Sequence, residues 1–160
     1  MRRVAYAATA YLVLSATACG SIDVTKALAL TDVKTGWYDA GVMEDGKNKL
    51  VPSISFKLTV QGDEPISTVQ VNAIFRRANE PEAWGEHFIK AIGTTPLAPG
   101  QSTGLIVARS YLGYTGEQPR QVMLRHTDFV DAKVDVFVKY GSQTWVRLGD
   151  YAIARQLLTQ

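Results

Sequence analysis

The chain has 160 residues, of which 46% are hydrophobic and 20% charged, and its 17 Lys and Arg residues nearly balance 15 Asp and Glu residues. This composition is that of one globular domain with a sizeable core. No block of clustered Lys and Arg is present to displace the counterions of a nucleic acid, so we expect no nucleic-acid partner. The single cysteine excludes a disulfide within the chain.

Residues 1–18 have the layout of a secretory signal peptide. Arg2 and Arg3 form a positive start, an apolar run follows, and small residues lead to a cleavage point between Ala18 and Cys19. The apolar run is too short to span a bilayer. Cleavage removes two of the 17 basic residues, so 15 remain against 15 acidic ones and the mature chain is expected to be neutral.

The motif at this cleavage point, Ala16-Thr17-Ala18-Cys19, resembles the lipobox of bacterial lipoproteins, although the family most often has leucine at the position of Ala16. The resemblance implies that Cys19 receives lipid and holds the protein on a membrane of the cell envelope, facing the periplasm. Gly20 is not the aspartate of inner-membrane retention, which favours the outer membrane in a bacterium with two membranes. The alternative is a secreted protein with an unmodified Cys19.

Residues 19–26 are expected to be the lipidated N-terminus and a polar tether, and residues 27–160 an all-β domain. A first strand is predicted at 27–33, followed by a turn-rich segment with the turn signal Asp45-Gly46. The clearest pattern is the strict alternation of apolar and polar residues over 54–60, with a similar alternation over 69–75, as in the B and C strands of a sandwich. Other predicted strands cover 84–92 at an edge, 104–110, 133–140 and 144–148. Residues 151–158 extend the last strand or form a terminal helix.

Between residues 110 and 129 the period changes to that of a helix. Thr115-Gly116-Glu117-Gln118 has the spacing of a capping box. The amphipathic stripe that follows consists of Val122, Met123, His126, Phe129 and Val130. We therefore predict an antiparallel immunoglobulin-like β-sandwich of about seven strands, with one short helix between the late strands and packed over the end of the sandwich.

A second motif spans residues 52–110. Val69, Val71 and Phe75 share one strand, and the turn Leu97-Ala98-Pro99-Gly100-Gln101-Ser102 precedes the next. This stretch resembles the small envelope and stress-related sandwiches of the FxLYD and WHy type, although Asn72 and Arg76 stand where the FxLYD motif has phenylalanine and aspartate. Because these families are mostly binding or structural modules, the resemblance implies no activity.

No combination of residues commits the domain to catalysis, a metal or a cofactor, so we expect none of the three. His126 and Asp128 lack the Gly-x-Ser-x-Gly turn of a hydrolase, and His126 is expected to cap or pack the helix. His87 is expected at the surface of an edge strand, and two histidines without a free thiol cannot form a nitrogen and sulfur zinc site. The acidic loop lacks the spacing of a calcium motif; its oxygen-bearing residues are Asp39, Glu44, Asp45 and Asn48.

Five aromatic residues are candidates for a binding patch: Trp37, Tyr38, Trp84, Tyr111 and Tyr114. Large aromatic residues in a sandwich more often belong to the core. The hypothesis we prefer is a non-enzymatic, lipid-anchored module that docks or supports another envelope protein through loops or a sheet edge. The alternative is a periplasmic module for a small molecule or glycan, which requires Trp37, Trp84 and Tyr114 to line one cleft.

Overall fold

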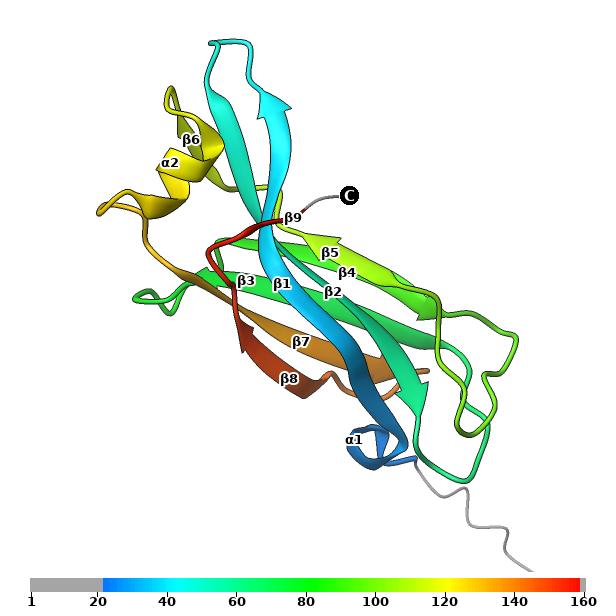
Figure 1. Ribbon diagram of the computed structural model, residues 1–160. Coiled ribbons are helices and arrows are strands. Elements are labelled where there is room, and N and C mark those ends of the chain that lie inside the picture. Colours follow the sequence, from blue (N-terminus) through cyan, green and yellow to red (C-terminus); the bar gives the residue numbers. More distant parts are fainter. Residues whose placement is uncertain (1–21, 159–160) are drawn as a thin grey trace, which may run out of the picture.

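The computed structural model describes residues 22–158 and folds them into two sheets packed face to face (Figure 1). The predicted cleavage point and Cys19 lie outside these residues. The two helices are α1 (Val24–Ala27) and α2 (Arg120–Arg125). The strands are β1 (Leu28–Val42), β2 (Asn48–Val60), β3 (Val69–Arg77), β4 (Gly85–Ile92), β5 (Ile106–Arg109), β6 (Tyr114–Gly116), β7 (Ala132–Tyr140), β8 (Val146–Ala152) and β9 (Leu157–Leu158).

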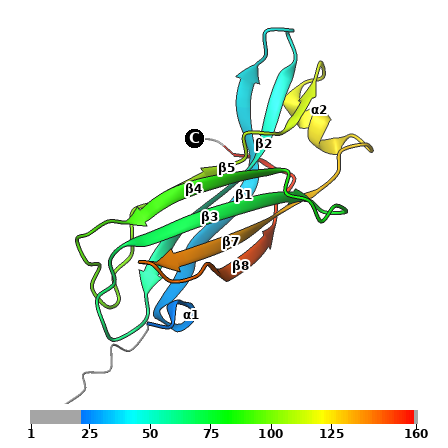
Figure 2. The same ribbon diagram turned by 180° about the vertical axis from the view of Figure 1, so that it is seen from behind.

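The strand order confirms the predicted immunoglobulin-like sandwich. One sheet has the order β5-β2-β1-β9, with β6 also paired to β2, and the other has the order β4-β3-β7-β8 (Figure 2). Every pairing is antiparallel except the short parallel pairing of β9 with β1. β2 and β3 follow each other in the chain but lie in opposite sheets, as the B and C strands of such a sandwich do. β4 lies at an edge, as predicted, and β6 and β9 are short additions to the main strands.

The core lies between the sheets and is built by the alternating residues of the strands. Val71, Ala73 and Phe75 of β3 and Phe56 of β2 are fully buried and belong to the same cluster. Burying one phenylalanine side chain contributes roughly 1.5–3 kcal/mol. The buried residues of both sheets form a single cluster. The sheets therefore depend on each other for stability.

The β1–β2 hairpin is much longer than the sequence pattern predicts. β1 does not end near residue 33 but continues to Val42, and a turn containing Gly46, with φ of +80°, leads into β2. The register of β1 shifts between Thr31 and Lys34, where Asp32 has φ of +53°. Such a bulge changes which residues face the core, so the alternation is interrupted in the sequence. The upper part of the hairpin consequently projects beyond the sandwich (Figure 1).

The predicted helix exists, but its predicted start is wrong. Thr115 does not cap a helix; it lies in β6 and pairs with Lys49 of β2. α2 begins after Pro119, which provides no side-chain cap. A Cβ atom at Gly113 would lie 2.0 Å from the carbonyl oxygen of Leu50, so the glycine lets the chain run directly over β2 before β6. This long-range pairing prevails over the local capping pattern.

Both ends of the described chain are joined to the sandwich. Val24 of α1 is buried in the core, so the ordered domain includes residues upstream of position 27. At the other end, β8 is followed by a turn, and β9 pairs with β1 at Trp37 and Tyr38. No terminal helix forms within residues 151–158. The arrangement is closer to the predicted extension of the last strand.

Candidate functional site

Three of the five candidate aromatic residues pack together at one end of the sandwich. The ring centroid of Tyr114 lies 5.6 Å from that of Trp37 and 5.0 Å from that of Trp84. Phe129 completes this aromatic cluster, with its ring centroid 4.5 Å from that of Trp37. The sequence pattern predicts Phe129 in the stripe of the helix, but in the structure it lies between α2 and β7. Its apolar character is the only feature of the sequence that indicates its burial.

The cluster packs with the core, and Trp37, Trp84 and Tyr114 do not line one cleft. Trp37 is 0% exposed, so its ring is out of reach of any ligand at the surface. The guanidinium carbon of Arg77 lies 5.0 Å from the centroid of the Trp84 ring and covers it. The Tyr114 hydroxyl donates a hydrogen bond to the Val130 carbonyl at 3.2 Å, and burial raises the pKa of Tyr114 above its ordinary value. These four side chains close the end of the sandwich.

The other two candidate aromatic residues lie elsewhere. Tyr38 follows Trp37 in β1 and therefore faces the opposite side of the sheet, where the Arg109 guanidinium carbon lies 3.5 Å from the centroid of its ring. Tyr111 is 65% exposed in the link between β5 and β6, and its carbonyl accepts a hydrogen bond from Lys49 Nζ at 3.0 Å. The five aromatic residues thus do not form a single patch.

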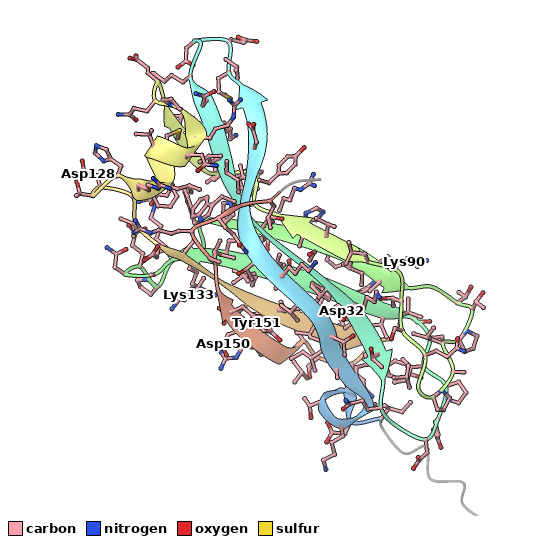
Figure 3. All side chains as sticks on the ribbon, in the orientation of Figure 1. Asp32, Lys90, Asp128, Lys133, Asp150 and Tyr151 are labelled. Atoms are coloured by element: carbon pink, nitrogen blue, oxygen red, sulfur yellow. The ribbon has the colours of Figure 1, made fainter. Side chains whose placement is uncertain are left out.

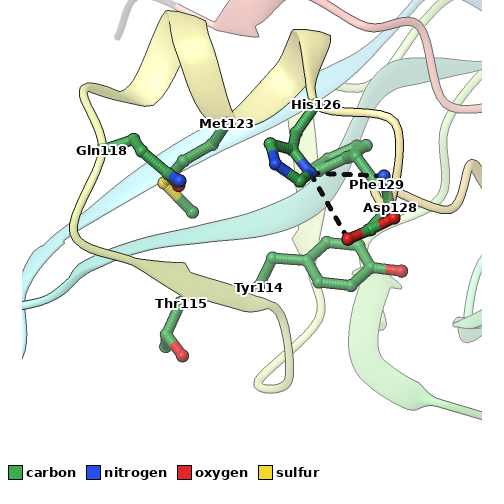
Figure 4. A pocket seen from close by; sticks show the side chains of 7 residues that line it. All are labelled: Tyr114, Thr115, Gln118, Met123, His126, Asp128 and Phe129. Atoms are coloured by element: carbon green, nitrogen blue, oxygen red, sulfur yellow. Dashed lines mark hydrogen bonds and ion pairs between the residues drawn. The ribbon is translucent and has the colours of Figure 1, made fainter.

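A small pocket lies beside the cluster, between β6 and α2 (Figure 4). Its volume is about 150 Å³, and its lining residues are Tyr114, Thr115, Gln118, Met123, His126, Asp128 and Phe129. His126 ends α2, as expected, and its backbone N–H donates to the Met123 carbonyl at 3.1 Å. The backbone N–H of Asp128 donates to His126 Nδ1 at 3.3 Å. Among the described residues, those that line this pocket include no serine or cysteine for His126 to activate.

The acidic loop uses its carboxylates within the fold. Asp39 forms an ion pair with Arg120 of α2 at 2.5 Å, and this neighbouring guanidinium lowers the pKa of Asp39 below its ordinary value. Asp45 pairs with Lys47 at 3.1 Å. Within residues 22–158 no group of three or more His, Cys, Asp or Glu side chains is placed to hold a metal ion. His87 lies in edge strand β4, and its Nδ1 accepts a hydrogen bond from the Arg109 N–H at 3.0 Å.

The end of the molecule that projects furthest from Ile22, where the described chain begins, carries the tip of the β1–β2 hairpin with α2 beside it (Figures 1 and 2). We call this region the distal end: the tip of the β1–β2 hairpin, the link from β5 to β6, and α2. Each of the following large apolar residues of the distal end is at least 41% exposed: Val42, Met43, Tyr111, Leu112 and Val122. Sequence periodicity missed this group because its members come from three separate segments.

Comparisons with known proteins give no family for the chain. No family model matches, and no curated protein matches. Similar solved structures include an X-ray structure of a Northeast Structural Genomics Consortium target, with 13% identity and a TM-score of 0.45, covering 82% of this chain and 89% of that one. Another, from Bordetella pertussis, carries the ApaA name, with 12% identity and a TM-score of 0.40, covering 79% and 92%.

A third similar structure is the ligand binding region of serine-glutamate repeat protein A of Enterococcus faecium, with 17% identity and a TM-score of 0.31, covering 75% of this chain and 88% of that one. At these TM-scores the likenesses carry no argument about function.

In the described part of the chain, neither helix has the length and apolar character required to cross a membrane.

Proposed function

We propose that this protein is a lipid-anchored protein of the cell envelope whose sandwich is a non-enzymatic docking module for another envelope protein. The observation that carries the proposal is the separation of two ends. The described chain begins at Ile22 beside α1, and the distal end with its exposed apolar residues lies at the opposite side of the molecule (Figure 1). A lipid on Cys19 would therefore direct the distal end away from the membrane.

The segment between the proposed anchor and the domain is short. From Cys19 to Asp23, where α1 is capped, an extended chain covers at most about 14 Å. Asp23 accepts a hydrogen bond from the Thr25 N–H at 3.1 Å, and Val24 packs into the core. The described chain is thus joined to the domain from Asp23 onward. A lipid-anchored sandwich would be held near the membrane at its α1 end.

The distal end has the character of a protein interface. Single exposed apolar side chains are ordinary on soluble proteins, whereas a group of them marks a contact surface. The group here includes Val42 and Met43 at the hairpin tip and Val122 on α2. The ion pair of Asp39 with Arg120 links the β1–β2 hairpin to α2. The glycan or small-molecule alternative is not favoured, because Trp37 is buried and Trp84 is covered by Arg77.

The anchor is tested by replacing Cys19 with alanine in the full chain. We expect Cys19→Ala to lose metabolic labelling by fatty acid and to move from the membrane fraction to the soluble envelope fraction, because lipid chains supply the membrane affinity. Ser21→Ala, in the same segment, is the matched control and should keep both the label and the membrane fraction. Membrane retention of a cleaved Cys19→Ala protein, or a wild-type protein without label, would contradict the lipid anchor.

The docking role is tested by photo-crosslinking in cells. A photoreactive residue in place of Val42 or Val122 should yield a crosslinked protein of defined size that saturates with expression level. The same group in place of Asp63, which lies near α1 at the other end, is the control and should not yield it. Identical products from both ends, or no product from the distal end of the anchored protein, would count against the proposal.

A further inference from the structure

A second surface lies on the outer face of the β4-β3-β7-β8 sheet, and the strand register fixes which residues share it. Phe88, Asn72, Phe137 and Arg147 form one row across the four strands. The next row is Glu86, Ile74, Asp135 and Asp150, and beyond it Arg76 pairs with Lys133. The face therefore places aromatic rings beside charged groups, at a surface different from the distal end.

A buried carboxylate organises two arginines on this face. Asp135 is 8% exposed, and its two oxygens accept hydrogen bonds from Arg76 Nη1 and, at 3.1 Å, from Arg147 Nη1. Arg76 Nε also donates to the Pro81 carbonyl at 2.9 Å. Each guanidinium carries five N–H donors, so both arginines retain donors after these bonds. The guanidinium groups are fixed before any ligand arrives, which lowers the entropy lost on binding.

The two arginines line an open pocket of about 500 Å³. Its other lining residues are Pro81, Lys133, Asp135 and Phe137. The pocket therefore holds three cations against the single carboxylate of Asp135. Asp150 of β8, labelled in Figure 3, lies 3.9 Å from Arg147, and its side chain is largely exposed, so solvent screens its charge. A carboxylate suits this site because arginine binds it through paired hydrogen bonds.

Aromatic rings extend the same face toward the β7–β8 turn. Trp145 and Phe88 meet edge to face, with ring centroids 5.9 Å apart, although one precedes β8 and the other lies in β4. Their exposed fractions are 39% and 55%. Lys139 Nζ lies 5.8 Å from the centroid of the Trp145 ring. Exposed Trp, Phe and Arg side chains together are characteristic of the central residues of protein interfaces.

From this combination we propose that the outer face of the β4-β3-β7-β8 sheet binds an acidic protein segment. Carboxylates of the segment bind the pocket of Arg76, Arg147 and Lys133, and a neighbouring apolar side chain packs on Phe88 and Trp145. Charge complementarity selects an acidic occupant, and the aromatic pair selects a protein over a bare anion. The inference does not depend on docking at the distal end, and it gives the sandwich a second, chemically different contact surface.

The test uses the full-length protein purified in detergent and two synthetic peptides. One peptide carries four Glu residues around a central Leu, and the other has Gln in place of each Glu. Isothermal titration calorimetry is expected to show that the Glu peptide binds at least about tenfold more tightly than the Gln peptide, because hydrogen bonds to charged groups are stronger than those to neutral groups. Because the contacts lie at an accessible surface, added salt should weaken that binding.

Single substitutions locate the binding. Arg147→Gln leaves Arg76 paired with Asp135 and should weaken binding of the Glu peptide about tenfold, as should Trp145→Ala. Lys133→Gln removes another cation of the same pocket and should also weaken binding of the Glu peptide. It takes the place of Arg147→Gln if that variant folds poorly. Lys34→Gln removes an exposed charge from the other sheet and should change nothing, and Val122→Ser at the distal end should also change nothing.

Three outcomes would overturn the proposal. The first is equal binding of the Glu and Gln peptides. The second is a loss of binding in Lys34→Gln as large as that in Arg147→Gln. The third is binding of dextran sulfate as tight as that of the Glu peptide and equally sensitive to Arg147→Gln, which would assign the face to polyanionic glycans. Because Val122→Ser is tested in parallel, failure here is distinguishable from failure of the distal-end proposal.

Discussion

Tyr114 joins three parts of the fold through one side chain. Its ring packs against Trp37 of β1 and Phe129 beyond α2, and its hydroxyl donates to the Val130 carbonyl. The sequence identifies Tyr114 as a candidate binding residue only because its side chain is aromatic. Its partners are distant in the chain, so the spacing of residues could not reveal that the ring closes the sandwich. The same burial gives the residue a measurable effect on stability at alkaline pH.

Tyr114 should make the fold sensitive to alkaline pH. Burial raises its pKa above the ordinary value of 10.0, so the folded state holds the phenol proton more tightly than the unfolded state. The stability associated with this proton is therefore complete below about pH 10 and is lost as the pH rises through the raised pKa. Tyr114→Phe should lose about 0.5–1.5 kcal/mol near neutral pH, through the missing hydrogen bond, and show a smaller further loss at alkaline pH.

Denaturant unfolding measured from neutral to alkaline pH checks this prediction. Tyr151, whose pKa is also raised by burial, keeps part of the alkaline loss in the variant. Tyr111→Phe is the matched control, because the Tyr111 side chain is exposed, and its pH profile should follow that of the unaltered protein. An alkaline loss in Tyr114→Phe as large as in the unaltered protein would contradict the role given to this phenol.

At the scale of elements, the success of sequence analysis depends on what each strand contacts. The alternation over 54–60 and 69–75 predicted β2 and β3, because each has one face on the core and one face toward solvent. β1 was predicted too short because its bulge at Asp32 interrupts the alternation. β6 was missed because its partner in β2 lies far away in the chain, whereas a capping box can be recognised locally.

The pairing of β9 with β1 depends on Gly36. The Trp37 N–H donates to the Gln156 carbonyl at 2.8 Å, and a Cβ atom at Gly36 would lie 2.9 Å from that oxygen. Gly36→Val should displace this segment, speed hydrogen exchange at the Trp37 amide and destabilise the protein by about 1–3 kcal/mol. Gly93→Val is the control, since a Cβ atom at Gly93 meets nothing within 4 Å. Unchanged exchange at Trp37 in Gly36→Val would show that β9 does not depend on this glycine.

At the scale of the whole molecule, both sheets share one hydrophobic core. The buried cluster runs from Val24 of α1 to Phe129 beside α2, so the α1 end and the distal end are connected through the same packed interior. The single cysteine cannot form a disulfide within the chain, and packing between the sheets must supply the stability. The sandwich should therefore unfold as one unit.

Phe75→Ala tests this cooperativity. Phe75 of β3 is fully buried, and its truncation should cost about 3–5 kcal/mol through lost burial and a residual cavity. Because the core is shared, thermal unfolding followed by near-ultraviolet circular dichroism of the aromatic cluster should coincide with that followed in the far ultraviolet. The midpoint should fall in Phe75→Ala but change little in Phe88→Ala, whose side chain is exposed. Two separate transitions in Phe75→Ala would mean that the sheets are stabilised independently, and that the α1 end and the distal end are not held by one frame.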